Sequence, residues 1–464
     1  MVTLGIYHWA YLLIVAILIL LMILKKDIIV PCILGVFLIG LIYGNWDIAF
    51  GLQSIFMAML TSGKELFDII LVISLMYAMS RAISLIGADR IMISPAVKLI
   101  KKPGLAFWVI AAVMYISSIF FWPTPATALV GIVLVPIAVK AGLRPLMAAG
   151  SLNIAGHGMA LSQDIVIQGA PGLSAAAAGV SISSVMFYSS IFSFVVGITA
   201  LCSAFIMNRK SLTIHSDEYP IYFSQVKEEK PSSPYAKYFA IGVPIVFMII
   251  IIRSIIGGLN LGFDMLIGGD ATALLGGTAT IIVIAALLAN NRHNFWNESM
   301  NILSEGFKFT IRIFAPIIPI SAFFMLGSPN HVESILGQYA PGFLFDIGTV
   351  AANVLPLSPI PIVIGIVIIS VITGFDGSGF SGLPLIGSLA AALAMPAGLN
   401  IEILVALGQV ITIFTGGGVL VAWAAAPAAG VCGVSATDII RKNFLPVMIG
   451  FGIAVILAII LLYL

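Results

Sequence analysis

Charged residues are scarce in this sequence. Asp, Glu, Lys and Arg make up 9% of the 464 residues, whereas a soluble domain carries roughly 25%. The basic residues lie in short segments between apolar runs, so the net charge of +2 gives no sign of a nucleic-acid partner. This composition excludes a soluble globular domain and indicates a protein whose solvent is largely the lipid bilayer.

Cysteine and the common catalytic motifs are also nearly missing. Cys32, Cys202 and Cys432 are each isolated inside an apolar segment, which excludes a disulfide framework and a zinc-ligand spacing. The sequence has no His-Glu-x-x-His motif and no Gly-x-Ser-x-Gly elbow. We therefore expect no enzyme activity, no bound metal and no cofactor other than a coupling ion.

Long apolar runs dominate what is present. Hydrophobic residues make up 61% of the chain, and the runs reach about 20 residues, the length that crosses a bilayer as a helix. No basic region precedes the first run, so it is expected to be a membrane span and not a cleaved signal. The sequence predicts an all-α polytopic membrane protein with spans near 4–24, 28–44, 64–87, 145–171, 180–207, 238–257, 269–289, 306–327, 401–427 and 440–463.

Two further apolar regions, 105–140 and 343–397, are interrupted by clusters of Pro, Gly and hydroxyl residues. We interpret both as re-entrant hairpins that enter and leave the membrane on one side. With this assignment most of the 21 Lys and Arg fall on one side, which the positive-inside rule identifies as the cytoplasm. The prediction is a multi-pass protein of the inner (plasma) membrane with both termini outside.

The chain divides into two halves joined by its one long polar segment. Residues 1–208 form the first half, 209–237 a cytoplasmic linker and 238–464 the second half. Each half holds about five spans and one hairpin, and an odd number of spans inverts the second half relative to the first. Gly142-Leu143 after the first hairpin matches Gly398-Leu399 after the second, and Pro171 matches Pro427 at the same offset.

The first interruption combines hydroxyls with prolines. Pro123 and the neighbouring Pro125 remove backbone donors and leave carbonyl groups unpaired. Free carbonyls and the hydroxyls of Thr124 and Thr127 suit a desolvated Na⁺, and the N–H groups that begin the following helix suit a carboxylate. We assign Thr124 and Thr127 to substrate binding and Pro123 to ion coupling. A capped proline kink is the alternative.

The second interruption, Thr373–Gly379, places one carboxyl group among glycines. An ionisable residue near the middle of a membrane is costly and is a functional candidate by default. We assign Asp376 and Gly377 to ion coupling and Ser378 to substrate binding. The alternative is that Asp376 only caps a helix.

The span after each hairpin is predicted to unwind as well. Residues 153–164 contain two glycines with several polar residues, and Gly416 to Gly418 interrupt the second span. We assign Asn153, His157 and Thr415 to substrate binding. Asp164 and Thr412 are assigned to ion coupling. The alternative for His157 is a hydrogen bond to a neighbour.

Two arginines, Arg81 and Arg312, lie within predicted spans. Arg312 is expected to pair with a substrate anion or with Glu305. Arg81 lies near an inner helix end, where its side chain is expected to extend to the interface.

Residues 66–446 resemble the ion transporter superfamily of secondary carriers. The resemblance is to the anaerobic C4-dicarboxylate uptake carriers of the DcuC type and more loosely to gluconate permeases. The segments that carry it are Pro123–Pro136, Ser162–Gln168 and Thr373–Gly379. It implies inverted repeats with two re-entrant hairpins, a homodimer, an elevator motion, and organic anions coupled to Na⁺ or H⁺. The Asn-Thr pairs that bind Na⁺ in one branch are absent, since Pro123-Thr124 and Gly377-Ser378 stand in their places.

The main hypothesis is a secondary active transporter of a small organic anion, a di- or monocarboxylate, with Na⁺ or H⁺ coupling. A cation/proton antiporter of the same architecture, using Asp164 and Asp376, is one alternative. A membrane subunit of a tripartite uptake system is another.

Overall fold

A computed structural model describes residues 3–24, 26–213, 233–258, 269–290, 295–354, 358–374, 379–420 and 425–464. Within these ranges the regular structure is helical, apart from an isolated bridge between Leu143 and Thr213. This confirms the all-α class. Five of the described helices are long and apolar enough to cross a membrane, or up to eight if each sharply bent pair forms one span.

The elements of the first half alternate long helices with short, broken ones. They are α1 (Ile6–Ile23), α2 (Ile29–Tyr43), α3 (Ile48–Leu85), α4 (Ala88–Val97), α5 (Pro103–Phe121), α6 (Pro123–Lys140), α7 (Pro145–Leu152), η1 (Asn153–Ala160), α8 (Leu161–Gln163), α9 (Gly169–Ala178), α10 (Ile182–Met207) and η2 (Arg209–Ser211).

The second half repeats this order from its hairpin onward. Its elements are α11 (Ala236–Gly258), α12 (Gly269–Asn290), α13 (Phe295–Phe314), α14 (Ile317–Met325), α15 (Pro329–Leu336), α16 (Phe343–Val354), α17 (Pro359–Gly374), α18 (Leu383–Ala394), α19 (Ile401–Phe414), η6 (Thr415–Val419), α20 (Ala426–Cys432) and α21 (Ala436–Tyr463).

Helices α5 and α6 form the first hairpin, as predicted. Proline begins each helix at a position where its missing N–H is not needed. Between them Trp122 takes φ 67° and ψ 145°, which reverses the chain within one residue. The second hairpin consists of α17 and α18. The ends of the two hairpins are marked by Gly142 and Gly398, which both adopt a positive φ that favours glycine.

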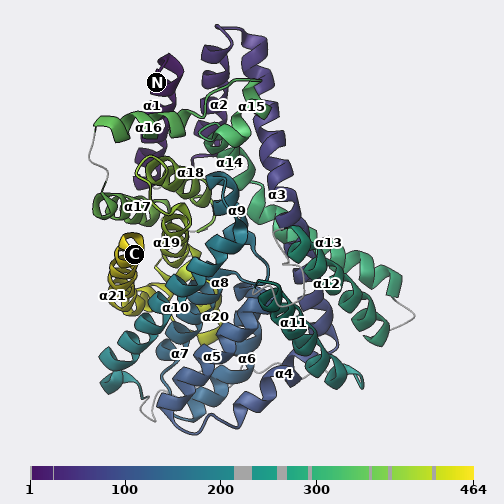
Figure 1. Ribbon diagram of the computed structural model, residues 1–464. Helices are drawn as coiled ribbons and strands as arrows, with labels where there is room; N and C mark the ends of the chain where they lie inside the picture. The colour runs from purple at the N-terminus through teal and green to yellow at the C-terminus, as the bar shows by residue number, and fades with distance from the viewer. Residues whose placement is uncertain are drawn as a thin grey trace.

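The two hairpins enter from opposite ends of the molecule. Figure 1 shows α5 and α6 in its lower part and α17 and α18 in its upper part. Each is followed by a helix that is interrupted by a π-helical segment, η1 in the first half and η6 in the second. The same elements therefore occur twice in opposite orientation, in agreement with the predicted inverted repeat.

Three predicted bounds are wrong. Helix α3 begins at Ile48 and not near residue 64, because Asp47 caps it by accepting a hydrogen bond from Ala49 N at 2.9 Å. Helix α13 likewise begins at Phe295 and not near residue 306. Residues 343–354 form the separate helix α16, so the second hairpin starts at Pro359. Most of the predicted linker 209–237 lies outside the described residues.

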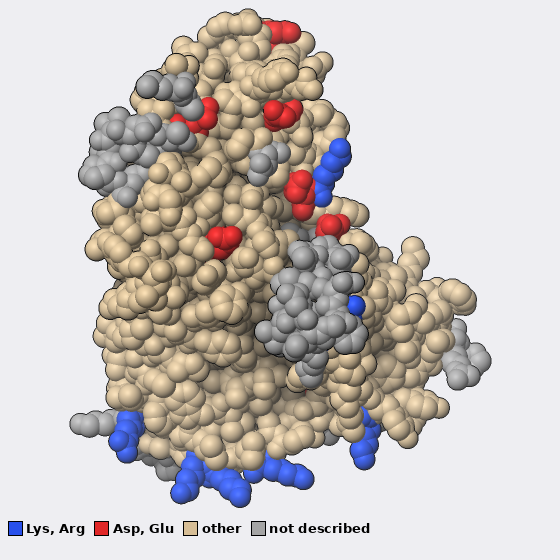
Figure 2. Space-filling view, in the orientation of Figure 1, with Lys and Arg blue, Asp and Glu red and all other residues tan. Residues whose placement is uncertain are grey.

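Charge is distributed unevenly along the long axis of the molecule. In Figure 2 most of the blue Lys and Arg side chains gather at the lower edge, with some higher up on the right, while the red carboxylates lie in the upper half of this face. Lys102 precedes α5 and Lys140 ends α6. Both ends of the first hairpin are therefore basic, as expected if it returns to the side from which it came.

We expect Gly450→Ala to destabilise the packing of α21 on α10. A Cβ at this position would lie 2.7 Å from the carbonyl oxygen of Val196 and 3.1 Å from its Cα. Overpacking of this kind costs about 1–3 kcal/mol, so the thermal unfolding midpoint in detergent should fall. Gly452→Ala on the same helix is the control, because a Cβ there meets nothing within 4 Å. Equal midpoints for the two variants would contradict this packing.

Candidate functional site

The two broken helices are in direct contact, through one side chain and through a close approach of their backbones. Asn153 Nδ2 in η1 donates to the carbonyl oxygen of Gly418 in η6 at 2.7 Å. A Cβ at Gly417 would lie 3.2 Å from the carbonyl oxygen of His157, so only glycine permits this approach without displacement. Gly418 has φ 124°, which ends the helix there. π-Helical segments of this kind occur frequently at functional sites.

Buried polar side chains fix the broken segments to their neighbours. Asn443 of α21 donates to Asn153 Oδ1 at 3.1 Å. Gln409 of α19 donates to the Ser162 carbonyl at 2.7 Å and accepts from Ser174 Oγ of α9 at 2.5 Å. Sequence reasoning missed Gln409 and Asn443. The available signal was a single amide side chain in each of two otherwise apolar spans.

The tips of both hairpins reach this centre. The rings of Trp122, at the first tip, and Phe380, just after the second, lie 5.6 Å apart between centroids. A Cβ at Gly379 would lie 2.9 Å from Gly417 N, so the second tip packs directly on η6. Three predicted site residues of that tip, Asp376, Gly377 and Ser378, lie outside the described residues, and their roles stay predictions.

Two of the four predicted threonine hydroxyls donate to a carbonyl one turn earlier in the chain. Thr127 Oγ1 donates to the Pro123 carbonyl at 2.7 Å, and Thr415 Oγ1 donates to the Ile411 carbonyl at 2.7 Å. Thr412 Oγ1 lies 3.4 Å from Thr373 Oγ1 of the second hairpin. Thr124 differs because its side chain is exposed.

Asp164 is buried and its carboxylate is held by backbone amides. The residue takes φ 42° and ψ 49°, which ends the broken segment. Its Oδ2 accepts from Ala170 N at 3.1 Å, and the backbone N–H groups of residues 167–169 also face the carboxylate. Asp164 therefore caps the N-terminal end of α9. Its predicted part in ion coupling stays a prediction.

His157 is 4% exposed, and neither ring nitrogen has a hydrogen-bond partner among the described residues. The buried Oγ of Ser118 on α5 and Oε1 of Gln163 are also unpartnered in this part of the chain. A Cβ at Gly156, beside His157, would lie 3.0 Å from Ser118 Oγ. Buried polar groups normally have partners. Among the described residues, His157, Ser118 and Gln163 are therefore the best candidates for polar contacts with a ligand in the centre.

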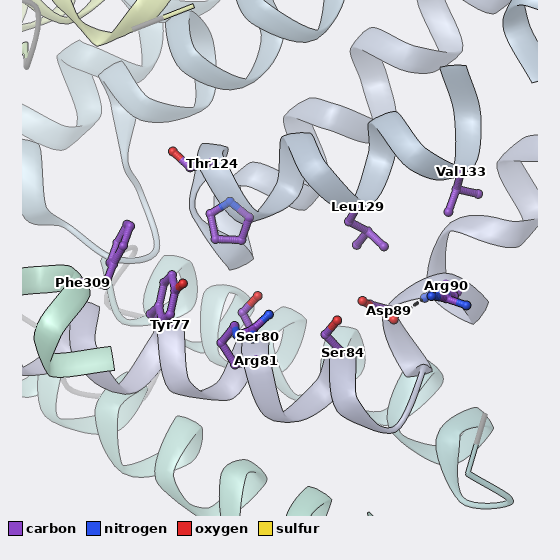
Figure 3. A pocket seen from close by; sticks show the side chains of 11 residues that line it. Tyr77, Ser80, Arg81, Ser84, Asp89, Arg90, Thr124, Leu129, Val133 and Phe309 are labelled. Carbon is purple, nitrogen blue, oxygen red and sulfur yellow. Dashed lines mark hydrogen bonds between the residues drawn. The ribbon is translucent and has the colours of Figure 1, made fainter. Parts of the chain in front are cut away.

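A cavity of about 410 Å³ lies between α3 and α4 on one side and the beginning of α6 on the other. Figure 3 shows Thr124 at one end of this cavity, Arg81 and Ser80 near its middle, and Asp89 with Arg90 at the other end. The cavity is lined by Tyr77, Ser80, Arg81, Ser84, Asp89, Arg90, Thr124, Pro125, Leu129, Val133 and Phe309. The cavity therefore joins the tip of the first hairpin to the basic end of the molecule.

The ionisable groups of this cavity were misjudged or missed from the sequence. Arg81 was expected to extend to the interface, but its Nε binds Glu305 Oε2 of α13 at 3.1 Å. The proposed pairing of Arg312 with Glu305 is therefore not observed. Asp89, on α4 outside the candidate spans, accepts from Arg90 N at 2.7 Å. Burial raises the pKa of Asp89, and its hydrogen bonds with Ser84 and Arg90 and the charge of Arg90 oppose that effect.

Comparisons with known proteins point to a membrane transporter. No protein-family model matches the chain. The uncharacterized membrane protein YhfA of Bacillus subtilis (strain 168) is 36% identical over 465 residues, which cover 98% of each chain.

Two solved structures share the fold. The YdaH transporter of Alcanivorax borkumensis has a TM-score of 0.59 at 13% identity and covers 88% of each chain. MtrF of Neisseria gonorrhoeae, described within a class of antimetabolite efflux pumps, has a TM-score of 0.54 at 17% identity, over 88% of this chain and 84% of that one. These likenesses leave the DcuC-type resemblance unconfirmed.

We expect a cysteine at Thr124 to react with a hydrophilic maleimide and a cysteine at Thr127 to be protected. Both residues belong to the first turns of α6, but Thr124 lines the cavity while Thr127 is fully buried. The labelling rates of the two variants in detergent measure this difference, with the parent chain giving the background of its own three cysteines. Equal labelling rates at the two positions would contradict the exposure of Thr124 and the burial of Thr127 in this structure.

Proposed function

Since the chain belongs to the same family as the Bacillus subtilis membrane protein YhfA and has the fold of solved transporters, we propose that it is a secondary active carrier of a small organic anion. The observation that carries this proposal is the meeting of two hairpins and two broken helices at one buried centre. Interrupted membrane helices in corresponding places of inverted halves mark the substrate site of secondary transporters.

The basic end of the molecule supports an orientation. Positive residues are concentrated in cytoplasmic loops of plasma-membrane proteins. We infer that the lower edge in Figure 2 faces the cytoplasm. The N-terminus, near the upper end of Figure 1, then lies outside, and the outside location of the C-terminus stays a prediction from the sequence. The cavity beside α4 belongs to this basic end, so it is the access to the first hairpin from the cytoplasm.

The substrate class follows from the groups that line the path. Arg81, Arg90 and Thr124 line the cavity, and guanidinium and hydroxyl groups suit a di- or monocarboxylate. The volume of about 410 Å³ lies within the range of about 300–1,000 Å³ that is common for small-molecule sites. Coupling to Na⁺ or H⁺, a homodimer and an elevator motion belong to the same proposal and rest on the resemblance of the sequence.

The antiporter hypothesis has less support. An exchange carboxylate must release its proton and accept a cation in turn, whereas the Asp164 carboxylate is already held by backbone amides of α9. The fold of MtrF keeps the direction of transport open, because that protein is described with efflux pumps.

The first experiment is transport by purified protein in proteoliposomes. Labelled succinate, citrate and gluconate are offered with Na⁺ and pH gradients imposed separately and in both directions. We expect at least one of these anions to accumulate in response to one gradient. Absence of accumulation under every gradient would contradict a coupled carboxylate carrier and favour the antiporter or the tripartite system.

Thr124→Val should lower the uptake of the accepted anion about tenfold or more. A hydrogen bond to a charged group contributes about 1.5–3 kcal/mol, and 1.4 kcal/mol corresponds to a factor of about ten. Thr124→Ser keeps the hydroxyl and is the matched control. Unchanged uptake by Thr124→Val would remove this residue from the substrate path.

A further inference from the structure

Arg81 is held by a contact that another anion can replace. Its Nε binds Glu305 Oε2 at 3.1 Å, and the two side chains are 47% and 48% exposed. An ion pair this exposed contributes little free energy because water screens it. Among the described residues, the guanidinium group of Arg81 has no hydrogen-bond or ion-pair partner other than Glu305, and Arg81 lines the cavity. Its remaining N–H groups suit a carboxylate.

The hydroxyls around Arg81 form one stripe of α3. Tyr77, Ser80 and Ser84 follow one another at spacings of three and four residues, Arg81 is next to Ser80, and all four line the same cavity. Thr124 lines the same cavity from the first turn of α6, and Figure 3 shows its hydroxyl pointing away from Ser80 and Arg81. Pro123 and Pro125 have no N–H, so Thr124 is the main donor of this turn. A carboxylate beside Arg81 therefore meets the hydroxyls of α3, and Thr124 lies at one end of the same cavity.

The other charges of the region favour binding of an anion between Arg81, near the middle of the cavity, and the Thr124 end. Asp89 lies at the opposite end, where it accepts from Arg90 N and is bonded to Ser84. On α13, Asn301, Glu305, Lys308 and Arg312 recur at helical spacing and are all exposed. Charged side chains on membrane helices normally face a partner or a water-filled space. This stripe indicates that the face beside Arg81 is hydrated.

We propose that this cavity is an anion-binding site in which Arg81 is the counter-ion of a carboxylate and Glu305 competes for Arg81. Glu305 thereby sets the affinity with which an organic anion is captured from the cytoplasmic side. Naming that anion as the cargo rests on the proposed carrier function, whereas the binding site itself does not.

The site is tested by whether an anion protects an introduced cysteine from maleimide. Leu129 lines the cavity, so Leu129→Cys is the test variant. Leu99 is exposed outside the cavity, so Leu99→Cys is the control. Maleimide labelling is measured in detergent against increasing succinate, citrate or gluconate, with chloride as the control for ionic strength. We expect at least one organic anion to slow labelling of Leu129→Cys and to leave Leu99→Cys unchanged.

Competition predicts opposite effects on anion affinity for substitutions of Arg81 and of Glu305. The half-protecting concentration is the anion concentration that halves the labelling rate of Leu129→Cys. Arg81→Gln should raise this concentration about tenfold or more, and Arg81→Lys should raise it less. Glu305→Gln should lower it, because Arg81 is then free for the anion. The double variant should behave like Arg81→Gln, and Arg312→Gln on the same face of α13 should resemble the parent. Size-exclusion profiles show which variants fold.

Protection by none of the three organic anions would overturn the site. So would a shift in the same direction for Arg81→Gln and Glu305→Gln, since a pair that only supports the structure responds in that way. Protection without transport in proteoliposomes would leave the site standing and contradict the carrier function. Transport without protection would keep the carrier function and remove this site.

Discussion

The constraint on which this structure depends is the need of every backbone N–H and C=O group for a partner inside the membrane. Two π-helical segments, η1 and η6, interrupt spans at the places where such breaks are most costly. They are tolerated because each covers the other: Asn153 binds the Gly418 carbonyl, and Gly417 lies against the His157 carbonyl. The hairpin tips complete the cover, since Gly379 packs on the backbone of η6. The inverted repeat thus places two interrupted helices side by side, so that each covers backbone groups that the interruption of the other exposes.

Part of this arrangement could be predicted from residue types alone. Prolines beside hydroxyls, or three consecutive glycines, are poorly compatible with an uninterrupted membrane helix, so both hairpins and both broken spans were located from the sequence. The basic residues then required the hairpins to return to one side. The early start of α3 was missed because the polar residues among 48–63 resemble an interfacial segment more than a membrane span. The local signal for the true start is the Asp47 cap, and the polar residues outweighed it.

Partners across helices could not be predicted. The sequence suggested Arg312 as a partner of Glu305 because both lie on one helix, whereas the observed partner, Arg81, depends on how α3 and α13 pack. The sequence assigned Asp164 to ion coupling and did not predict its contact with the amides of α9, because the chain reversal at Asp164 is not encoded by a recognisable turn motif. Gln409 and Asn443 are single polar residues whose sequence spacing says nothing about the carbonyl or amide that they meet.

The division of charge between the two sides of the cavity bears on how a carrier of this kind can move its site. Within the described tips and broken segments, 122–127, 153–164, 379–382 and 412–420, Asp164 is the only carboxylate and there is no Lys or Arg. The Arg81–Glu305 pair lies on α3 and α13 instead. Moving one elementary charge across the membrane changes its free energy by about 2.3 kcal/mol for each 100 mV of membrane potential. Under the proposed elevator motion, the described part of the centre would carry Asp164 and its cargo across the membrane potential. The charges on α3 and α13 would then attract an anion without crossing the membrane with it.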